Sequence, residues 1–162
     1  MRYLVLFFSI LMSGLLQAQP AQRMSADEIV DKLAPPARTR SLGQRAFRLE
    51  PRKLDFQIGF DFDSAKIRPD SLPQLEEIAR AMTADRLVSL RFKIEGHTDA
   101  VGTASYNENL SDRRARSVVE FLKARGIDAS RLEAEGKGMR ELADSANPQS
   151  AVNRRVRIIT ID

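Results

Sequence analysis

The amino-acid sequence predicts an α+β domain: a two-layer β-α-β-α-β-β sandwich with a mixed sheet and its helices on one face. Three observations support this class. Short runs with an apolar residue at every second position alternate with longer runs of helical period. Two helices that connect strands predict right-handed crossovers, which place both helices on the same side of one sheet. A content of 43% hydrophobic and 30% charged residues is typical of a globular domain.

The first strand and the first helix of this domain are expected within residues 54–60 and 71–83. The strand LDFQIGF places apolar side chains on one face, namely Leu54, Phe56, Ile58 and Phe60. In the helix SLPQLEEIARAMT, Ser71 is the expected N-cap and Pro73 lies in the first turn. The core-facing stripe of this helix consists of Leu72, Leu75, Ile78, Ala79 and Met82.

The second strand and second helix follow from the same patterns. The strand VSLRFKIEG turns three apolar side chains inward, those of Leu90, Phe92 and Ile94. The helix is expected within residues 105–126, beginning near Tyr106 and ending at Gly126, the residue type that most often stops a helix. Its apolar face is formed by Leu110, Val118, Phe121 and Leu122.

Two further strands complete the sheet. The segment DASRLEAEGKG is expected to form a turn and a short strand, in which Gly136 and Gly138 permit a bend. Residues 139–151 are polar and irregular in pattern. The segment RRVRIITI is rich in β-branched residues and predicts the last strand.

The N-terminal third differs from the rest. A basic start precedes the fourteen apolar or small residues Tyr3 to Leu16, fewer than the roughly 20 that a membrane span needs. Residues 1–18 are therefore expected to be a secretory signal peptide cleaved after Ala18, with a membrane anchor or a buried helix as alternatives. The chain contains no cysteine, which excludes a lipid-anchored lipoprotein, disulfides and thiolate metal sites.

Residues 19–53 are expected to be a tail or linker, followed by a globular domain over residues 54–162. The tail contains a short helix, SADEIVDKL, in which Ser25 and Glu28 have the spacing of a capping box. An arginine-rich stretch from Arg38 to Arg52 follows it. The net charge of +4 is compatible with a polyanionic partner without requiring one.

The candidate site lies in IEGHTDAVG, residues 94–102, which contains the only histidine of the chain. In α/β units, ligands bind where strands end and helices begin. Gly96 and Gly102 allow the backbone to turn at this junction. On the following helix, Asn107, Ser111 and Arg114 share one face, so that Arg114 and the loop acid Asp99 are expected at one pocket.

Three kinds of chemistry fit this loop. A metal site has only His97 and Asp99 as evident ligands, fewer than zinc requires. A hydrolytic triad of His97, Asp99 and Ser105 or Ser111 lacks the usual nucleophile motif. A ligand clamp suits a zwitterion best, because a carboxylate binds an ammonium and a guanidinium binds a carboxylate. An ordinary Asp99–Arg114 ion pair is the structural alternative.

Four segments together resemble the OmpA-like C-terminal domain family, which includes the Pal lipoproteins and the periplasmic part of MotB. These are GHTDAVG (96–102), YNENLSDRRARSVVEFL (106–122), GID…RL…GKG (126–138) and NRRVRI (153–158). The resemblance runs from about Leu54 to Asp162. There is no β-barrel before the domain, no lipobox and no charged membrane span, so the chain is most similar to freestanding secreted members.

The resemblance implies non-catalytic, non-covalent binding of peptidoglycan through the diaminopimelate of the stem peptide. It assigns Asp99 to the amine and Arg114 to a carboxylate. The remaining ligand-binding positions that it implies are Thr98, Asn107, Arg154 and Arg155, of which either arginine could face the pocket. The residues that it implies to support the loop are Gly96, His97, Gly102 and Ser111. Neither a cofactor nor a metal is implied.

The resemblance also implies a location in the periplasm of a Gram-negative bacterium, in association with the outer membrane. An alternative function is envelope assembly or secretion, with an outer-membrane or envelope protein bound by the arginine-rich tail. A wall hydrolase is a further alternative. Nucleic-acid binding is disfavoured because the basic residues are not interleaved with aromatic ones.

Overall fold

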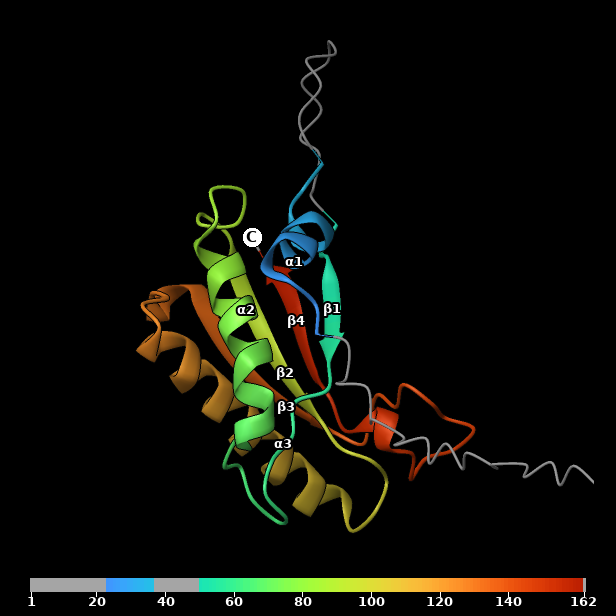
Figure 1. Cartoon of the computed structure of the whole chain (residues 1–162). Helices are drawn as coiled ribbons and strands as arrows, with labels where there is room; N and C mark the ends of the chain where they lie inside the picture. Colours follow the sequence, from blue (N-terminus) through green and yellow to red (C-terminus); the bar gives the residue numbers. More distant parts are fainter. Residues whose placement is uncertain (1–22, 37–49, 162) are drawn as a thin grey trace, which may run out of the picture.

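The computed structural model describes residues 23–36 and 50–161 (Figure 1). The expected signal peptide and most of the arginine-rich stretch lie outside these residues. Within them, no helix combines the length and the apolar character that crossing a membrane requires. The helices and strands are α1 (Ala26–Leu33), β1 (Lys53–Phe56), α2 (Leu72–Thr83), β2 (Arg91–His97), α3 (Ala104–Ala124), β3 (Leu132–Gly138) and β4 (Val156–Ile161).

The four strands form one mixed sheet in the order β1-β4-β2-β3. Strand β2 pairs in parallel with β3, whereas β4 is antiparallel to both of its neighbours, β1 and β2. The helices α2 and α3 lie on one face of this sheet, as Figure 1 shows. The predicted α+β class, the element order and the placement of the helices are therefore confirmed.

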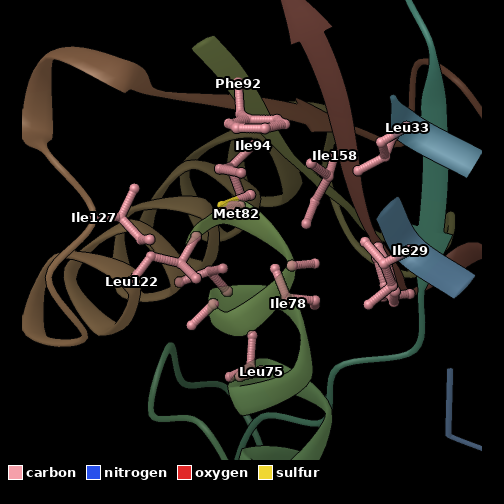
Figure 2. Close-up of a cluster of buried hydrophobic side chains, with 14 of the residues drawn as sticks. Ile29, Leu33, Leu75, Ile78, Met82, Phe92, Ile94, Leu122, Ile127 and Ile158 are labelled. Atoms are coloured by element: carbon pink, nitrogen blue, oxygen red, sulfur yellow. The ribbon is translucent and has the colours of Figure 1, made fainter. Parts of the chain in front are cut away.

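The hydrophobic core lies between the sheet and its helices (Figure 2). Alternation along β2 and β4 buries Phe92, Ile94 and Ile158 completely on the helical face. The helical period of α2 and α3 supplies the opposing layer, which includes Leu75, Ile78, Met82, Val118 and Leu122.

Helix α1 also belongs to this core. Its N-terminus has the predicted capping box, in which Ser25 and Glu28 each accept a hydrogen bond from the other's backbone N–H. Ile29 and Leu33 are fully buried. The Gln74 side chain accepts a hydrogen bond from the Met24 N–H over 2.9 Å, which ties the start of α1 to α2. The folded unit thus includes residues well before position 54.

The beginning of the domain departs from the expected pattern in two places. Strand β1 ends at Phe56, although the alternation continues to Ile58 and Phe60, because only the first half of the segment pairs with β4. Phe60 instead forms an isolated bridge with Ile67. Ser71 is at the N-cap position, but its hydroxyl accepts from the Gly59 N–H over 2.8 Å and does not cap the helix.

Helix α3 begins two residues before the expected start. Thr103 is its N-cap, and the Thr103 hydroxyl accepts a hydrogen bond from the Tyr106 N–H. The expected stop is confirmed, since Gly126 has a φ of +85° directly after the C-cap residue.

Close contact between α3 and the sheet fixes where α3 lies. A Cβ atom on Gly96 would be 2.2 Å from the Ser111 carbonyl oxygen, and one on Gly136 would be 2.6 Å from the Asp112 nitrogen. The Ser111 hydroxyl accepts a hydrogen bond from the Gly138 N–H over 2.8 Å. The two glycines therefore allow the first turns of α3 to lie directly on the C-terminal ends of β2 and β3.

Candidate functional site

The loop that follows β2 is held on three sides by backbone hydrogen bonds. The N–H groups of His97, Thr98 and Ala100 donate to the carbonyl oxygens of Arg155, Gly138 and Pro148, each over 2.9 Å. Gly138 is the last residue of β3, whereas Pro148 and Arg155 belong to the segment between β3 and β4. The position of the loop is thus determined by three residues from later parts of the chain.

Asp99 uses both of its carboxylate oxygens within the protein. Its Oδ1 atom accepts from the Val101 N–H over 3.2 Å, a contact that turns the loop back on itself. Its Oδ2 atom accepts from Nη1 of Arg154 over 2.7 Å. The Asp99 side chain is 13% exposed and that of Arg154 is 49% exposed, so this ion pair opens to solvent on the arginine side.

Arg114 is held by other contacts than the ion pair with Asp99 that was the structural alternative. Its Nε atom donates to the Ser64 carbonyl oxygen over 3.0 Å. Its guanidinium lies 5.0 Å from the centroid of the Phe60 ring, within the range of a cation–π contact. Partial burial lowers the pKa of Arg114 from its ordinary value, and the charge of Arg154 acts in the same direction.

Arg114 and Arg154 line one small pocket. The other residues of its lining are Ile58, Phe60, Gly96, His97, Arg155 and Val156. Asp99 is directly paired with Arg154 at this site. The arrangement offers two guanidinium groups to an anionic group of a ligand, and a carboxylate to a cationic group.

Asn107, expected to contact a ligand, is buried with 2% of its surface exposed. Its amide donates to the Val101 carbonyl oxygen over 2.9 Å and so fastens α3 to the loop after β2. Thr98 is equally buried, and its hydroxyl has no hydrogen-bond partner in the described part of the chain. Both side chains are thus buried in the protein.

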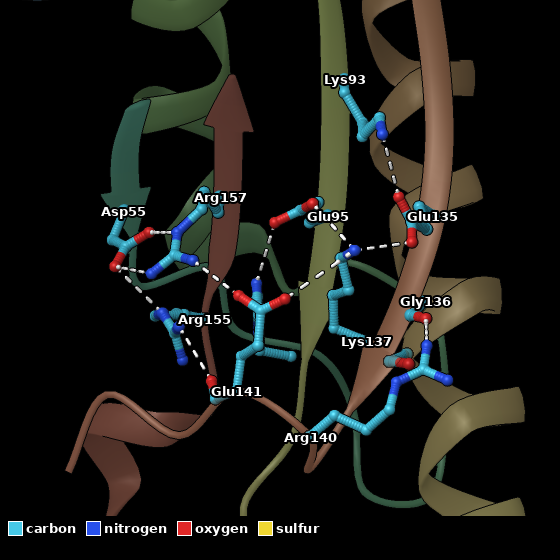
Figure 3. Close-up of polar contacts among 12 residues, drawn as sticks. Asp55, Lys93, Glu95, Glu135, Gly136, Lys137, Arg140, Glu141, Arg155 and Arg157 are labelled. Atoms are coloured by element: carbon cyan, nitrogen blue, oxygen red, sulfur yellow. Dashed lines mark hydrogen bonds and ion pairs between the residues drawn. The ribbon is translucent and has the colours of Figure 1, made fainter. Parts of the chain in front are cut away.

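Arg155 differs from its neighbour Arg154 because its side chain is directed into the protein (Figure 3). The Arg155 side chain is only 2% exposed, and its Nε atom donates to Asp55 over 3.0 Å. Its Nη2 atom donates to the Glu141 carbonyl oxygen, also over 3.0 Å. Of the two arginines, Arg154 is thus the one with a solvent-exposed guanidinium beside Asp99.

Burial on its own would raise the pKa of Asp55. The hydrogen bonds and positive charges of Arg157 and Arg155 outweigh that effect and hold the pKa below its ordinary value. The same balance applies to Glu95, where burial is again opposed, in this case by His97 and Lys137. These acids are therefore tied to the folded state through their arginine and lysine neighbours.

The sheet face opposite the helices carries a polar network that sequence patterns did not reveal (Figure 3). Glu95 and Glu135 are direct partners across β2 and β3, and Lys137 lies between them. The Nζ atom of Lys137 is 3.3 Å from Glu95 and 2.6 Å from Glu135. Charged residues at every second position of β2 and β3 were the available signal.

His97 lies between this network and the pocket. Its side chain is fully buried, and Nε2 is 3.5 Å from Glu95 Oε2, outside hydrogen-bonding geometry. Within residues 23–36 and 50–161, no three His, Asp or Glu side chains are grouped in a way that could hold a metal ion.

The loop between β3 and β4 depends on Asn153, which is completely buried. The Asn153 amide donates to the carbonyl oxygens of Asp144, Asn147 and Pro148. These contacts fix the segment that places Arg154 next to Asp99. Asn153 is the first residue of the NRRVRI segment that carries the family resemblance, but nothing in the sequence indicated that its amide holds this loop.

Comparisons with known proteins agree with this fold. The model of the OmpA family matches residues 59–156. The chain is similar to the outer-membrane lipoprotein YfiB of Pseudomonas aeruginosa, with 33% identity over 96% of this chain and 90% of that protein. It is also similar to outer membrane porin F of the same species, with 37% identity over 64% of this chain.

The chain spans only 30% of the length of porin F, so this second likeness concerns one part of that protein. Among solved structures, it is similar to the peptidoglycan-associated lipoprotein of Burkholderia pseudomallei. That likeness has a TM-score of 0.55 and 28% identity, and covers 64% of this chain and 88% of the other. The family model covers more than half of the chain, and the chain belongs to the OmpA family.

Proposed function

We propose that this protein binds peptidoglycan without catalysis or covalent attachment, through the diaminopimelate of the stem peptide, and tethers the cell wall to the envelope. The observation that carries the proposal is the grouping of Asp99 with Arg154, and of Arg154 with Arg114 at one pocket. Diaminopimelate has an ammonium and a carboxylate at the end of its side chain. Those two groups match the charges of the site.

In the bound state that we propose, the ligand ammonium takes the place of Arg154 at Asp99. The guanidinium groups of Arg114 and Arg154 then receive the ligand carboxylate. Each hydrogen bond to a charged partner contributes roughly 1.5–3 kcal/mol. The ion pair that must open is exposed on one side and contributes about 0–1 kcal/mol, so the exchange favours the ligand.

The relatives support binding to the wall. One is named a peptidoglycan-associated lipoprotein, and two others are outer-membrane proteins. We further propose that this protein is exported by a signal peptide over residues 1–18 and lies in the periplasm, associated with the outer membrane.

The contacts of the polar groups near the site support a binding role over hydrolysis. The Ser111 hydroxyl, one of the two serines considered as a nucleophile, donates to the Glu108 carbonyl oxygen and accepts from the Gly138 N–H. His97 is fully buried beside Glu95. A serine nucleophile requires a base within hydrogen-bonding distance. The Ser111 hydroxyl is instead bonded to two backbone groups, and no hydrogen bond joins it to His97.

Sedimentation with purified peptidoglycan tests the proposal. Wild-type protein and the variants Asp99→Asn, Arg114→Gln and Arg113→Gln are incubated with diaminopimelate-type sacculi, with and without free diaminopimelate as competitor. Arg113 is the control because it is an exposed arginine next to Arg114 on α3. We expect wild type and Arg113→Gln to sediment, and the other two to remain in solution. Equal sedimentation of all four proteins would refute the site.

The same incubation tests the absence of catalysis. We expect the supernatant to contain no soluble wall fragments beyond those of a protein-free sample. Fragment release that Asp99→Asn or His97→Ala abolishes would show a hydrolase and overturn this part of the proposal.

A further inference from the structure

Phe62 is the most exposed large hydrophobic residue of the described chain, with its surface 100% accessible. It lies at the tip of the segment between Phe60 and Ile67, which are joined by an isolated β-bridge. The Asp61 N–H donates to the Lys66 carbonyl oxygen over 3.0 Å and closes the same turn. Phe62 is therefore presented to solvent by a defined turn.

Two residues of α3, Arg114 and Tyr106, hold this turn in place. Ser64, two positions after Phe62, accepts the hydrogen bond from Arg114 over 3.0 Å. Asp63, which has a φ of +48°, accepts a hydrogen bond from the Tyr106 hydroxyl. This bond raises the pKa of Tyr106, so the phenol remains a donor at neutral pH. The turn that carries Phe62 is thus anchored to α3 beside the pocket.

Tyr106 connects the turn to the loop after β2. Its hydroxyl donates to Asp63. Its ring packs against Gly102, where a Cβ atom would lie 3.4 Å from the Cδ1 atom of Tyr106. Val101, the residue before Gly102, is 56% exposed, and Tyr106 itself is 41% exposed. Exposed apolar side chains consequently occur on the turn, on α3 and on the loop that together surround the charged site.

The distribution of exposed large hydrophobic residues favours this region. The described ranges contain six exposed large hydrophobic residues. Four of them are within two sequence positions of a site residue, or of a residue that contacts the site: Phe62, Val101, Tyr106 and Val152. The other two are Leu72 and Val88. Single exposed apolar residues need no explanation, but their concentration around a charged pocket is typical of a binding surface.

We propose that Phe62, Tyr106 and Val101 form an apolar rim that contacts the stem peptide beside the diaminopimelate, chiefly the methyl groups of its alanine residues. The proposal rests on the proposed function, since it extends the same site. When the zwitterionic end of the diaminopimelate side chain enters the pocket, the peptide main chain crosses the mouth. An extended peptide advances about 3.5 Å per residue, so the residues next to diaminopimelate lie within reach of the rim.

The charges near Phe62 favour a peptide over a lipid surface. Asp61 and Asp63 precede and follow Phe62 in the sequence, and two carboxylates on this turn would repel an anionic membrane. The sugars of the glycan are separated from diaminopimelate by two further residues of the stem peptide. The peptide is consequently the part of the polymer nearest to the rim.

Calorimetric titration distinguishes contact with the rim from binding in the pocket. The ligands are free diaminopimelate, the tetrapeptide L-Ala–D-Glu–diaminopimelate–D-Ala and the same tetrapeptide linked to its disaccharide. The proteins are wild type, Phe62→Ala and the control Val88→Ala, which truncates an exposed residue after α2. Thermal unfolding shows that each variant is folded, which is expected because both side chains face solvent.

We expect the Kd of Phe62→Ala for free diaminopimelate to stay within about twofold of the wild-type value. Its Kd for the tetrapeptide should rise at least about fivefold, because an aromatic ring that the peptide partly buries is lost. Val88→Ala should change neither value. Equal affinity of wild type and Phe62→Ala for the tetrapeptide would overturn the rim. So would a loss that appears only with a disaccharide-linked peptide, because the contact would then be to sugar.

The outcomes separate this inference from the proposed function. Loss of binding in Asp99→Asn with no effect of Phe62→Ala refutes the rim and leaves the pocket intact. If wild type binds neither ligand, the proposed function fails together with the rim.

Discussion

Arg154 donates from Nη1 to Oδ2 of Asp99 over 2.7 Å, whereas Arg155 directs its guanidinium to Asp55 and to the Glu141 carbonyl oxygen. Two consecutive arginines thus have opposite roles. The Arg154 side chain is half exposed at the site, and that of Arg155 is buried beneath it. Because the Asp99–Arg154 pair is open to solvent on the arginine side, a ligand ammonium can displace it at low cost.

This difference predicts contrasting effects on stability. Arg154→Gln should change the free energy of unfolding by less than about 1 kcal/mol, as is typical of exposed ion pairs. Arg155→Gln should lower it by about 3–5 kcal/mol, because a buried partner of Asp55 and of a carbonyl group is lost. Urea denaturation at neutral pH measures both values. Equal losses in the two variants would contradict the assignment of Arg155 as the structural arginine.

Asn107 gives a second prediction, which concerns how the loop is held. Asn107→Ala leaves the Val101 carbonyl oxygen without its donor and should lower the free energy of unfolding by about 1–3 kcal/mol. Peptidoglycan binding should weaken as a consequence, because the same loop carries Asp99. Chemical denaturation and sedimentation on the same samples provide the measurement. Loss of binding without loss of stability would show instead that Asn107 touches the ligand.

Much of the fold could be predicted because its signals are local. The alternation in β2 is visible within a few residues and predicts the burial of Phe92 and Ile94. The helical period of α3 is visible within a few turns and predicts the burial of Leu122. The extent of β1 and the docking of α1 were less accessible. The length of β1 depends on its pairing with β4, and the position of α1 depends on its contacts with α2. Both partners are distant in the sequence.

The site shows the same division. Asp99 and Arg114 were expected at one pocket, because Asp99 follows a strand and Arg114 lies on the helix that comes next. The partner of Asp99 could not be predicted, because Arg154 is 55 positions away and is placed by the loop that Asn153 organises. Phe62 had no sequence signal, as an apolar residue between two acids continues the alternating pattern of the strand before it.

Gly96 provides a third prediction, on the contact between α3 and the sheet. Gly96→Ala would bring a Cβ atom to 2.2 Å from the Ser111 carbonyl oxygen, so α3 must move or the strand must distort. We expect a loss of about 3 kcal/mol or more in the free energy of unfolding. The displaced helix also moves Arg114, and binding should fall with stability.

The control for Gly96 is Gly126→Ala at the end of the same helix. No atom lies within 4 Å of the Cβ position there, but φ is +85°, so only backbone strain of about 1–2 kcal/mol is expected. Peptidoglycan binding by this variant should remain at the wild-type level. Similar losses of stability in the two variants would show that conformational strain, and not the approach of α3, determines the requirement for glycine at position 96.

The fourth prediction concerns pH. The pKa values of Asp55 and Glu95 lie below their ordinary values in the folded protein, so the unfolded chain binds more protons than the folded one on acidification. Their contribution to stability should be complete above about pH 5, beyond the unfolded pKa values of about 3.9 and 4.3. It should decline as the pH falls through the lower folded values. Urea denaturation between pH 7 and pH 3 measures this decline.

Asp55→Asn removes one of these titrating groups and also the carboxylate that Arg155 and Arg157 share. The variant should therefore be less stable than wild type at pH 7, and its stability should fall less steeply with acidification, so that the two curves converge toward pH 3. Asp85→Asn, in the exposed turn after α2, is the matched control and should follow the wild-type curve. Parallel curves for wild type and Asp55→Asn would mean that the Asp55 carboxylate contributes no pH-dependent stability, and the linkage between its arginine partners and the folded state would be wrong.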